Sequence, residues 1–151
     1  MSYITCGFIG LGLIGGSIAK ALKAFRRDVR ILAFDTNKET LALALKEGIA
    51  DEAVSSINER FSVCDYLFLC APVSNNDKNL TAIKEILSPD CILTDVGSVK
   101  STTFRCVEET GLSPYFIGGH PMAGSERIGF ANSHALLLQN AYYLLTPSAE
   151  V

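Results

Sequence analysis

Three short segments of this 151-residue chain contain side chains that could do chemistry, and each follows an apolar run. The richest is 118–126, GGHPMAGSE, where an imidazole, a hydroxyl and a carboxylate stand among small residues that have little to bury. His120 is suited to proton transfer, because the ordinary pKa of histidine is about 6.5. A loop-stabilising hydrogen bond is the alternative role for His120. For His134, in a predicted helix, we favour a structural role.

The other two segments are 70–73, CAPV, and 95–100, DVGSVK. The first ends the apolar run 66–71, YLFLCA, whose lack of alternation is typical of a central strand covered on both faces, and the second follows the next predicted strand, 91–95. Open α/β sheets bind their ligands beyond the carboxyl ends of such strands. We therefore expect all three segments to meet at one edge of a sheet.

A fourth motif, Gly10-Leu11-Gly12-Leu13-Ile14-Gly15, has the GxGxxG pattern of dinucleotide-binding loops. It follows an apolar run and opens an amphipathic segment, and Asp35 stands 20 residues after Gly15. Gly10 permits a tight turn, Gly12 lets the backbone approach a pyrophosphate, and Gly15 allows close packing of helix and strand. Free N–H groups at the helix start would receive the phosphates. An ordinary strand–helix turn is the alternative.

Asp35 indicates which dinucleotide is bound. A carboxylate at this place accepts hydrogen bonds from ribose hydroxyls and repels a 2′-phosphate, so NAD is favoured over NADP. The next residues, Thr36 and Asn37, add no arginine, although Lys38 leaves NADP open.

The elements that must position these residues alternate along the chain. Strands are predicted at 3–9, 30–34, 51–54, 66–71, 91–95, 115–117 and 142–145, and helices at 13–25, 38–47, 76–87, 101–110 and 130–138. This alternation predicts one α/β domain, a Rossmann-type doubly wound, mainly parallel sheet with helices on both faces.

Composition excludes several classes of protein. With 48% hydrophobic and 19% charged residues the chain can bury a core, so disorder is excluded. A net charge of −3 gives no reason to expect nucleic acid or a membrane as partner. The five cysteines are odd in number and contain no CxxC pair, so we expect neither disulfides nor a metal site. With no signal peptide or membrane-length apolar run, a cytoplasmic protein is expected.

The motifs GLGLIGGS, CAPV, TDVGSVK, GGHPMAGSE and YYLLTP, in this order, resemble the prephenate and arogenate dehydrogenases of tyrosine biosynthesis. The glycine string is shared with many dehydrogenases, whereas DVGSVK followed by GGHPMAGSE is specific. The resemblance implies NAD-dependent oxidative decarboxylation of prephenate. Hydride passes from C4 to the nicotinamide and CO2 is lost, which gives 4-hydroxyphenylpyruvate and NADH.

The resemblance also implies roles for individual residues. His120 would contact the C4 hydroxyl as base or hydrogen-bond acceptor, Ser98 would orient His120, and Glu126 would belong to the polar network around the substrate. Ser98 could instead cap the following helix, and Glu126 could be a carboxylate in a helical first turn. The expected cofactor-binding residues are Gly10, Leu11, Gly12, Leu13, Ile14, Gly15, Asp35, Thr36, Ala71, Pro72, Val73, Asp95 and Gly97.

Family members continue into a mainly helical domain that forms a homodimer and supplies cations for the substrate carboxylates. Residues 1–151 are therefore expected to be the dinucleotide-binding domain of a longer protein, with Lys100 and Arg127 as the only basic groups near the site. Three alternatives stay open: arogenate as the substrate, a catalytically silent NAD-binding module, and a disfavoured β-hydroxyacid dehydrogenase that shares the opening GFIGLG.

Overall fold

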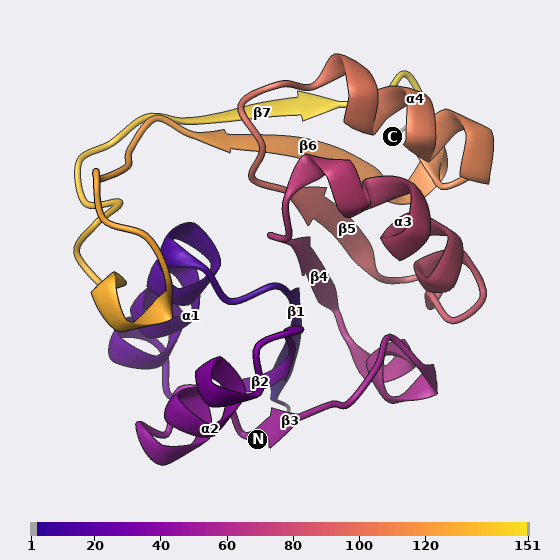
Figure 1. Ribbon diagram of the computed structural model, residues 1–151. Coiled ribbons are helices and arrows are strands. Elements are labelled where there is room, and N and C mark those ends of the chain that lie inside the picture. Colours follow the sequence, from indigo (N-terminus) through magenta and orange to yellow (C-terminus); the bar gives the residue numbers. More distant parts are fainter. Residues whose placement is uncertain (1–2, 151) are drawn as a thin grey trace.

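Seven strands form one sheet in the order β3-β2-β1-β4-β5-β6-β7 in the computed structural model, which describes residues 3–150 (Figure 1). All neighbours pair in parallel except β6 and β7, which are antiparallel. Met1, Ser2 and Val151, which belong to the predicted domain, lie outside the described residues. The strands are β1 Ile4–Ile9, β2 Val29–Phe34, β3 Glu52–Ala53, β4 Tyr66–Leu69, β5 Ile92–Asp95, β6 Phe116–Pro121 and β7 Tyr143–Pro147.

The α-helices are α1 Leu13–Phe25, α2 Lys38–Lys46, α3 Asn76–Lys84 and α4 Ser101–Thr110. Asn37 caps α2, since its side chain accepts hydrogen bonds from the N–H groups of Glu39 and Thr40 at 2.9 and 3.3 Å. Gly111 ends α4 in the left-handed conformation, with φ of 74°. The described part of the chain has no helix long and apolar enough to cross a membrane.

Side chains of alternating strand residues enter two separate cores. Phe8, Ile31 and Ala33 pack with residues of α1 and α2 on one face, while their neighbours Ile9 and Leu32 pack with residues of α3 and α4 on the other. Figure 1 shows the two pairs of helices on opposite sides of the sheet. The predicted doubly wound α/β fold is confirmed.

The predicted helix at 130–138 is wrong. Only a single 3₁₀ turn, Phe130–Asn132, forms there, and irregular turns follow it. Polar groups that would pair within a helix bond to α1 instead: the His134 N–H donates to the Ser17 hydroxyl at 3.1 Å, and Lys20 donates to the carbonyl of Ser133 at 3.2 Å. His134 is consequently exposed and belongs to no helix.

The strand predicted at 115–117 runs further than expected, to Pro121, so His120 lies in β6 rather than in a loop. Gly118 and Gly119 allow this extension because the neighbouring elements approach their backbone closely. A Cβ added to Gly119 would lie 2.5 Å from the carbonyl oxygen of Asp95 and 2.9 Å from the ring of Tyr143. His120 is paired with Leu144 of β7.

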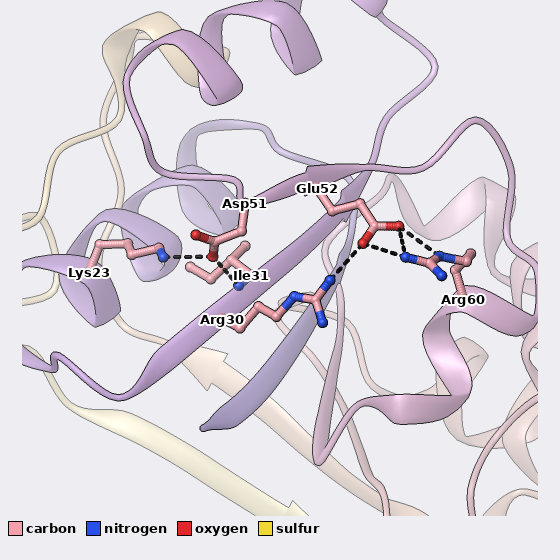
Figure 2. Close-up of polar contacts among 6 residues, drawn as sticks. All are labelled: Lys23, Arg30, Ile31, Asp51, Glu52 and Arg60. Carbon is pink, nitrogen blue, oxygen red and sulfur yellow. Dashed lines mark hydrogen bonds and ion pairs between the residues drawn. The ribbon is translucent and has the colours of Figure 1, made fainter. Parts of the chain in front are cut away.

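Ion pairs fix the two-residue strand β3 at the other edge of the sheet (Figure 2). Glu52 pairs with Arg30 at 2.9 Å and with Arg60 at 2.7 Å. The preceding Asp51 accepts from Lys23 at 2.6 Å and from the N–H of Ile31 at 2.7 Å. These contacts hold the β2–β3 edge in register, and none of the six residues lines a cavity described below.

Candidate functional site

A cavity of about 670 Å³, the main cavity, opens at the carboxyl ends of the central strands. Its lining comes from the glycine loop, from Asp35 and Thr36 after β2, from the loops after β4 and β5, and from Ser125 and residues 127–129. This is where the strand order reverses, between β1 and β4, and where open α/β sheets bind ligands. Of the predicted site residues, those that line it are Gly10, Gly12, Leu13, Ile14, Asp35, Thr36, Ala71, Pro72, Val73, Gly97 and Ser98.

The three glycines of the GxGxxG pattern have different surroundings. Gly10 has a φ of +96°, and a Cβ there would lie 2.7 Å from the backbone nitrogen of Ala71. A Cβ on Gly15 would meet the Gly10 carbonyl oxygen at 2.7 Å, because α1 packs tightly on β1 and β4. Gly12 has nothing within 4 Å, so its side of the loop is open to a ligand. The environments of Gly10 and Gly15 fit the turn and the close packing predicted for them, while the role of Gly12 at a pyrophosphate stays a prediction. Gly15 is buried and does not line the cavity.

Asp35 is held in place by two backbone donors. Its carboxylate oxygens accept hydrogen bonds from the N–H of Leu11 and the N–H of Asn37, each at 2.8 Å. Leu11 is buried and lies outside the cavity lining, so it contributes this N–H group and its packing. Each carboxylate oxygen keeps acceptor capacity, and Asp35 can therefore also receive hydroxyl donors in the main cavity.

A second cavity of about 350 Å³ adjoins the first and shares Thr36, Asn75 and Asn79 with it. Phe34, Ile57 and Ala82 give it apolar walls, and the remaining lining residues are Ser56 and Lys78. Residues in this cavity other than Thr36 were missed at the sequence level, since they belong to no motif. Their only signal is position, because they end β2, follow β3 or belong to α3 and the turn before it.

Asp95 has a different place from the one predicted. Its side chain is only 3% exposed and does not line the main cavity. Lys100 contacts both carboxylate oxygens, at 2.5 and 2.6 Å, and the N–H groups of Gly119 and Gly97 donate to them at 3.0 and 3.2 Å. The ion pair closes the DVGSVK segment on itself, and the hydrogen bond from the Gly119 N–H joins it to β6, the strand that carries His120. The ion pair also neutralises the charge of Lys100.

The three predicted catalytic residues are not all in the cavity lining. Ser98 is exposed and lines it, whereas half-buried His120 and exposed Glu126 do not line it. Lys100 occupies the N-cap position of α4, without a side-chain cap, so the capping alternative for Ser98 is wrong. Glu126 lies in no helix, so the helical alternative is also wrong. The structure records no hydrogen bond to the His120 ring within residues 3–150.

Tyr143 was also missed, and only the apolar run YYLLTP could have drawn attention to it. Its ring and hydroxyl lie against Gly119, on the strand of His120. Burial raises the pKa of the Tyr143 phenol to about 12, with smaller contributions from Cys70 and Asp95. Among residues 3–150, no group of three His, Cys, Asp or Glu side chains could hold a metal ion.

Comparisons with known proteins agree with this geometry. The family profile described as "Prephenate dehydrogenase, nucleotide-binding domain" matches residues 18–151. A prephenate dehydrogenase of Bacillus subtilis is 36% identical over 143 residues, which are 91% of this chain and 38% of that protein. A cyclohexadienyl dehydrogenase of Zymomonas mobilis is 32% identical over 141 residues, 93% of this chain and 48% of the relative.

Two solved structures are similar over nearly the whole chain. A prephenate dehydrogenase from A. aeolicus, in complex with hydroxyphenyl propionate and NAD⁺, has a TM-score of 0.91 and 35% identity over 100% of this chain and 53% of that one. A Synechocystis arogenate dehydrogenase has a TM-score of 0.88 and 32% identity, and the match covers 97% of this chain and 51% of that one. The chain thus spans about half the length, or less, of these proteins.

Proposed function

This chain belongs to the prephenate dehydrogenase family, and from that membership we propose that it provides the NAD-binding part of an enzyme that oxidatively decarboxylates prephenate. The observation that carries the proposal is the main cavity, which gathers the glycine loop, Asp35, the CAPV loop and Ser98 of the DVGSVK loop. The product would be 4-hydroxyphenylpyruvate.

The cavities fit a dinucleotide. Gly12 leaves open space beside the first turn of α1, which carries no acidic residue, so the helix N-terminus is favourable to a pyrophosphate. The Asp35 carboxylate is placed to accept hydrogen bonds from ribose hydroxyls. The second cavity, with apolar walls beyond Asp35, has the character that an adenine ring requires. On the A. aeolicus relative NAD⁺ is the bound cofactor, and we propose the same for this chain.

The chemistry assigned to the chain's own residues is proton transfer and orientation. NAD, when bound, supplies the hydride acceptor. We propose that neutral His120 accepts the proton of the substrate C4 hydroxyl, which raises the driving force for hydride departure. Ser98, exposed at the cavity, would orient His120, and Glu126 would belong to the polar network around the substrate. As the C4 carbonyl forms, it accepts the electrons that the departing carboxylate releases.

Calorimetric titration of the 151-residue chain with NAD tests the cofactor proposal, and NADH production from prephenate by the longer protein that contains this domain tests the reaction. His120→Asn should lower kcat by at least 100-fold, the lower range for general acid–base catalysis, and leave the NAD dissociation constant unchanged. His134→Asn is the matched control, since His134 is exposed away from the cavities. A kcat for His120→Asn within a few-fold of the parent value would refute the role of His120.

A second candidate substrate is arogenate, because the Synechocystis arogenate dehydrogenase is nearly as similar as the A. aeolicus enzyme. Parallel assays with prephenate and arogenate decide between them through the ratio of kcat/KM. A third outcome, NAD binding without turnover of either substrate, would support the binding-module alternative.

Two further expectations accompany the proposal. The five cysteines are free and four of them are buried, which supports a reducing compartment. The homodimer implied by the family resemblance stays a prediction, which light scattering of the purified protein would test.

A further inference from the structure

Residues 125–129, which we call the cleft wall, contribute four residues to the lining of the main cavity. Ser125, Arg127, Ile128 and Gly129 line the cavity together with Gly12, Leu13 and Ile14. The cleft wall belongs to the long β6–β7 connection, which contains no α-helix. Its position must therefore be fixed by contacts with other elements.

Those contacts come from α1, just after the glycine string. Gly16 lets residues 130–133, which follow the cleft wall, pack directly on α1. A Cβ on Gly16 would lie 2.7 Å from both the Phe130 ring and the Ser133 hydroxyl. Lys20 lies 4.4 Å from the centre of the Phe130 ring and donates to the carbonyl of Ser133. Gly16, outside the GxGxxG pattern, thus holds the cleft wall against the helix that carries the open loop.

Charge at the cavity is the second observation. Arg127 is the only cationic residue that lines the main cavity in the part of the chain that the structure describes. No carboxylate lies within ion-pairing distance of the Arg127 side chain among the described residues, whereas Lys100 is paired with Asp95. A bound pyrophosphate would bring two negative charges to a cavity whose own carboxylate is Asp35.

We propose that Arg127 is a pyrophosphate-binding residue, which the cleft wall brings into the same cavity that the N-terminus of α1 lines. This inference rests on the proposed dinucleotide function. Gly12, Leu13 and Arg127 line one cavity, so the phosphates can contact the open N–H groups and the guanidinium together. A substrate carboxylate is the competing anion, and the test below separates the two.

The test measures binding rather than turnover. Wild type, Arg127→Gln and Arg127→Lys are titrated with NAD, with ADP-ribose, which keeps the pyrophosphate, and with adenosine, which lacks it. Arg127→Gln should weaken NAD and ADP-ribose binding by about tenfold or more, as expected for a charge-assisted hydrogen bond. Adenosine binding should not change, and Arg127→Lys should recover part of the loss. Arg105→Gln, an exposed arginine on α4, is the matched control.

The position of the cleft wall is tested by Gly16→Ala, which should displace Phe130 and Ser133 and weaken NAD binding in a protein with native circular dichroism. The inference is overturned if Arg127→Gln binds NAD within twofold of wild type, if adenosine affinity falls equally, or if only the KM for prephenate changes. If the wild type prefers NADP, the proposed cofactor is wrong. The affinity of Arg127→Gln for NADP, compared with that of wild type, then still tests the role of Arg127. Wild type that binds neither dinucleotide nor ADP-ribose overturns both proposals.

Discussion

The buried pair of Asp95 and Lys100 leads to the prediction with the largest expected effect on stability. Lys100→Met keeps most of the side-chain volume, which packs close to Gly118, and removes the ammonium group. It leaves a carboxylate that is 3% exposed with only two backbone donors, the N–H groups of Gly119 and Gly97. An uncompensated buried charge is the expected cause of destabilisation.

The magnitude follows from the geometry. At a contact distance of 2.6 Å and an effective dielectric constant of about 20, the lost Coulomb energy is about 6 kcal/mol. Breaking one side of a buried pair typically costs about 3–5 kcal/mol, because water and the remaining donors offset part of this energy. For a domain of this size the melting temperature should fall by roughly 6–20 °C.

The assay is urea unfolding at neutral pH, followed by circular dichroism in the presence of a reductant. Adding Asp95→Asn to Lys100→Met removes the stranded charge, so the double variant should be more stable than Lys100→Met alone. Lys84→Met, at an exposed position on α3, is the control. A free energy of unfolding for Lys100→Met within about 1 kcal/mol of wild type, or no recovery in the double variant, would refute the reasoning.

Three other predictions concern the cofactor cavity and the core. Gly12→Val should fold normally, because nothing lies within 4 Å of an added Cβ, and should lose NAD affinity in calorimetry. Gly10→Val should instead be destabilised, since its φ is +96° and backbone atoms are close. Asp35→Asn should narrow the ratio of NADP to NAD dissociation constants at least tenfold, and an unchanged ratio would contradict its role in selecting NAD. Burial raises the pKa of the Cys6 thiol from 9.0 to about 11, so the stabilisation from its retained proton is complete below pH 9 and is lost between pH 9 and pH 11. Urea midpoints over this range should fall less steeply in Cys6→Ala than in wild type.

The features that could be predicted from sequence depend on neighbours in the chain. The alternation of strands and helices, the turn at Gly10 and the cap at Asn37 are local consequences of residue type, and the structure confirms each. The central strands were recognisable because both faces of the sheet are buried, so their residues are almost uniformly apolar.

The failures depend on partners far away in sequence. Apolar residues at 130–138 suggest a helix, but Ser17 and Lys20, more than 110 residues earlier, take the polar groups of the segment. The carboxylate of Asp95 was expected at the cofactor, yet the N–H of Gly119 and the ammonium of Lys100 enclose it. No sequence pattern reports such tertiary competition.

The contacts between the β6–β7 connection and α1 should also control how fast this part of the protein opens. Buried Phe130 and the contacts of Lys20 and Ser17 hold this segment on α1, and we predict that it opens locally while the strands of the sheet stay paired. Its amides, including that of His134, should therefore exchange with deuterium through local opening, much faster than those of β1 and β4. Such opening would set the rate at which a dinucleotide enters and leaves, and bound NAD should slow exchange in this segment more than in the sheet.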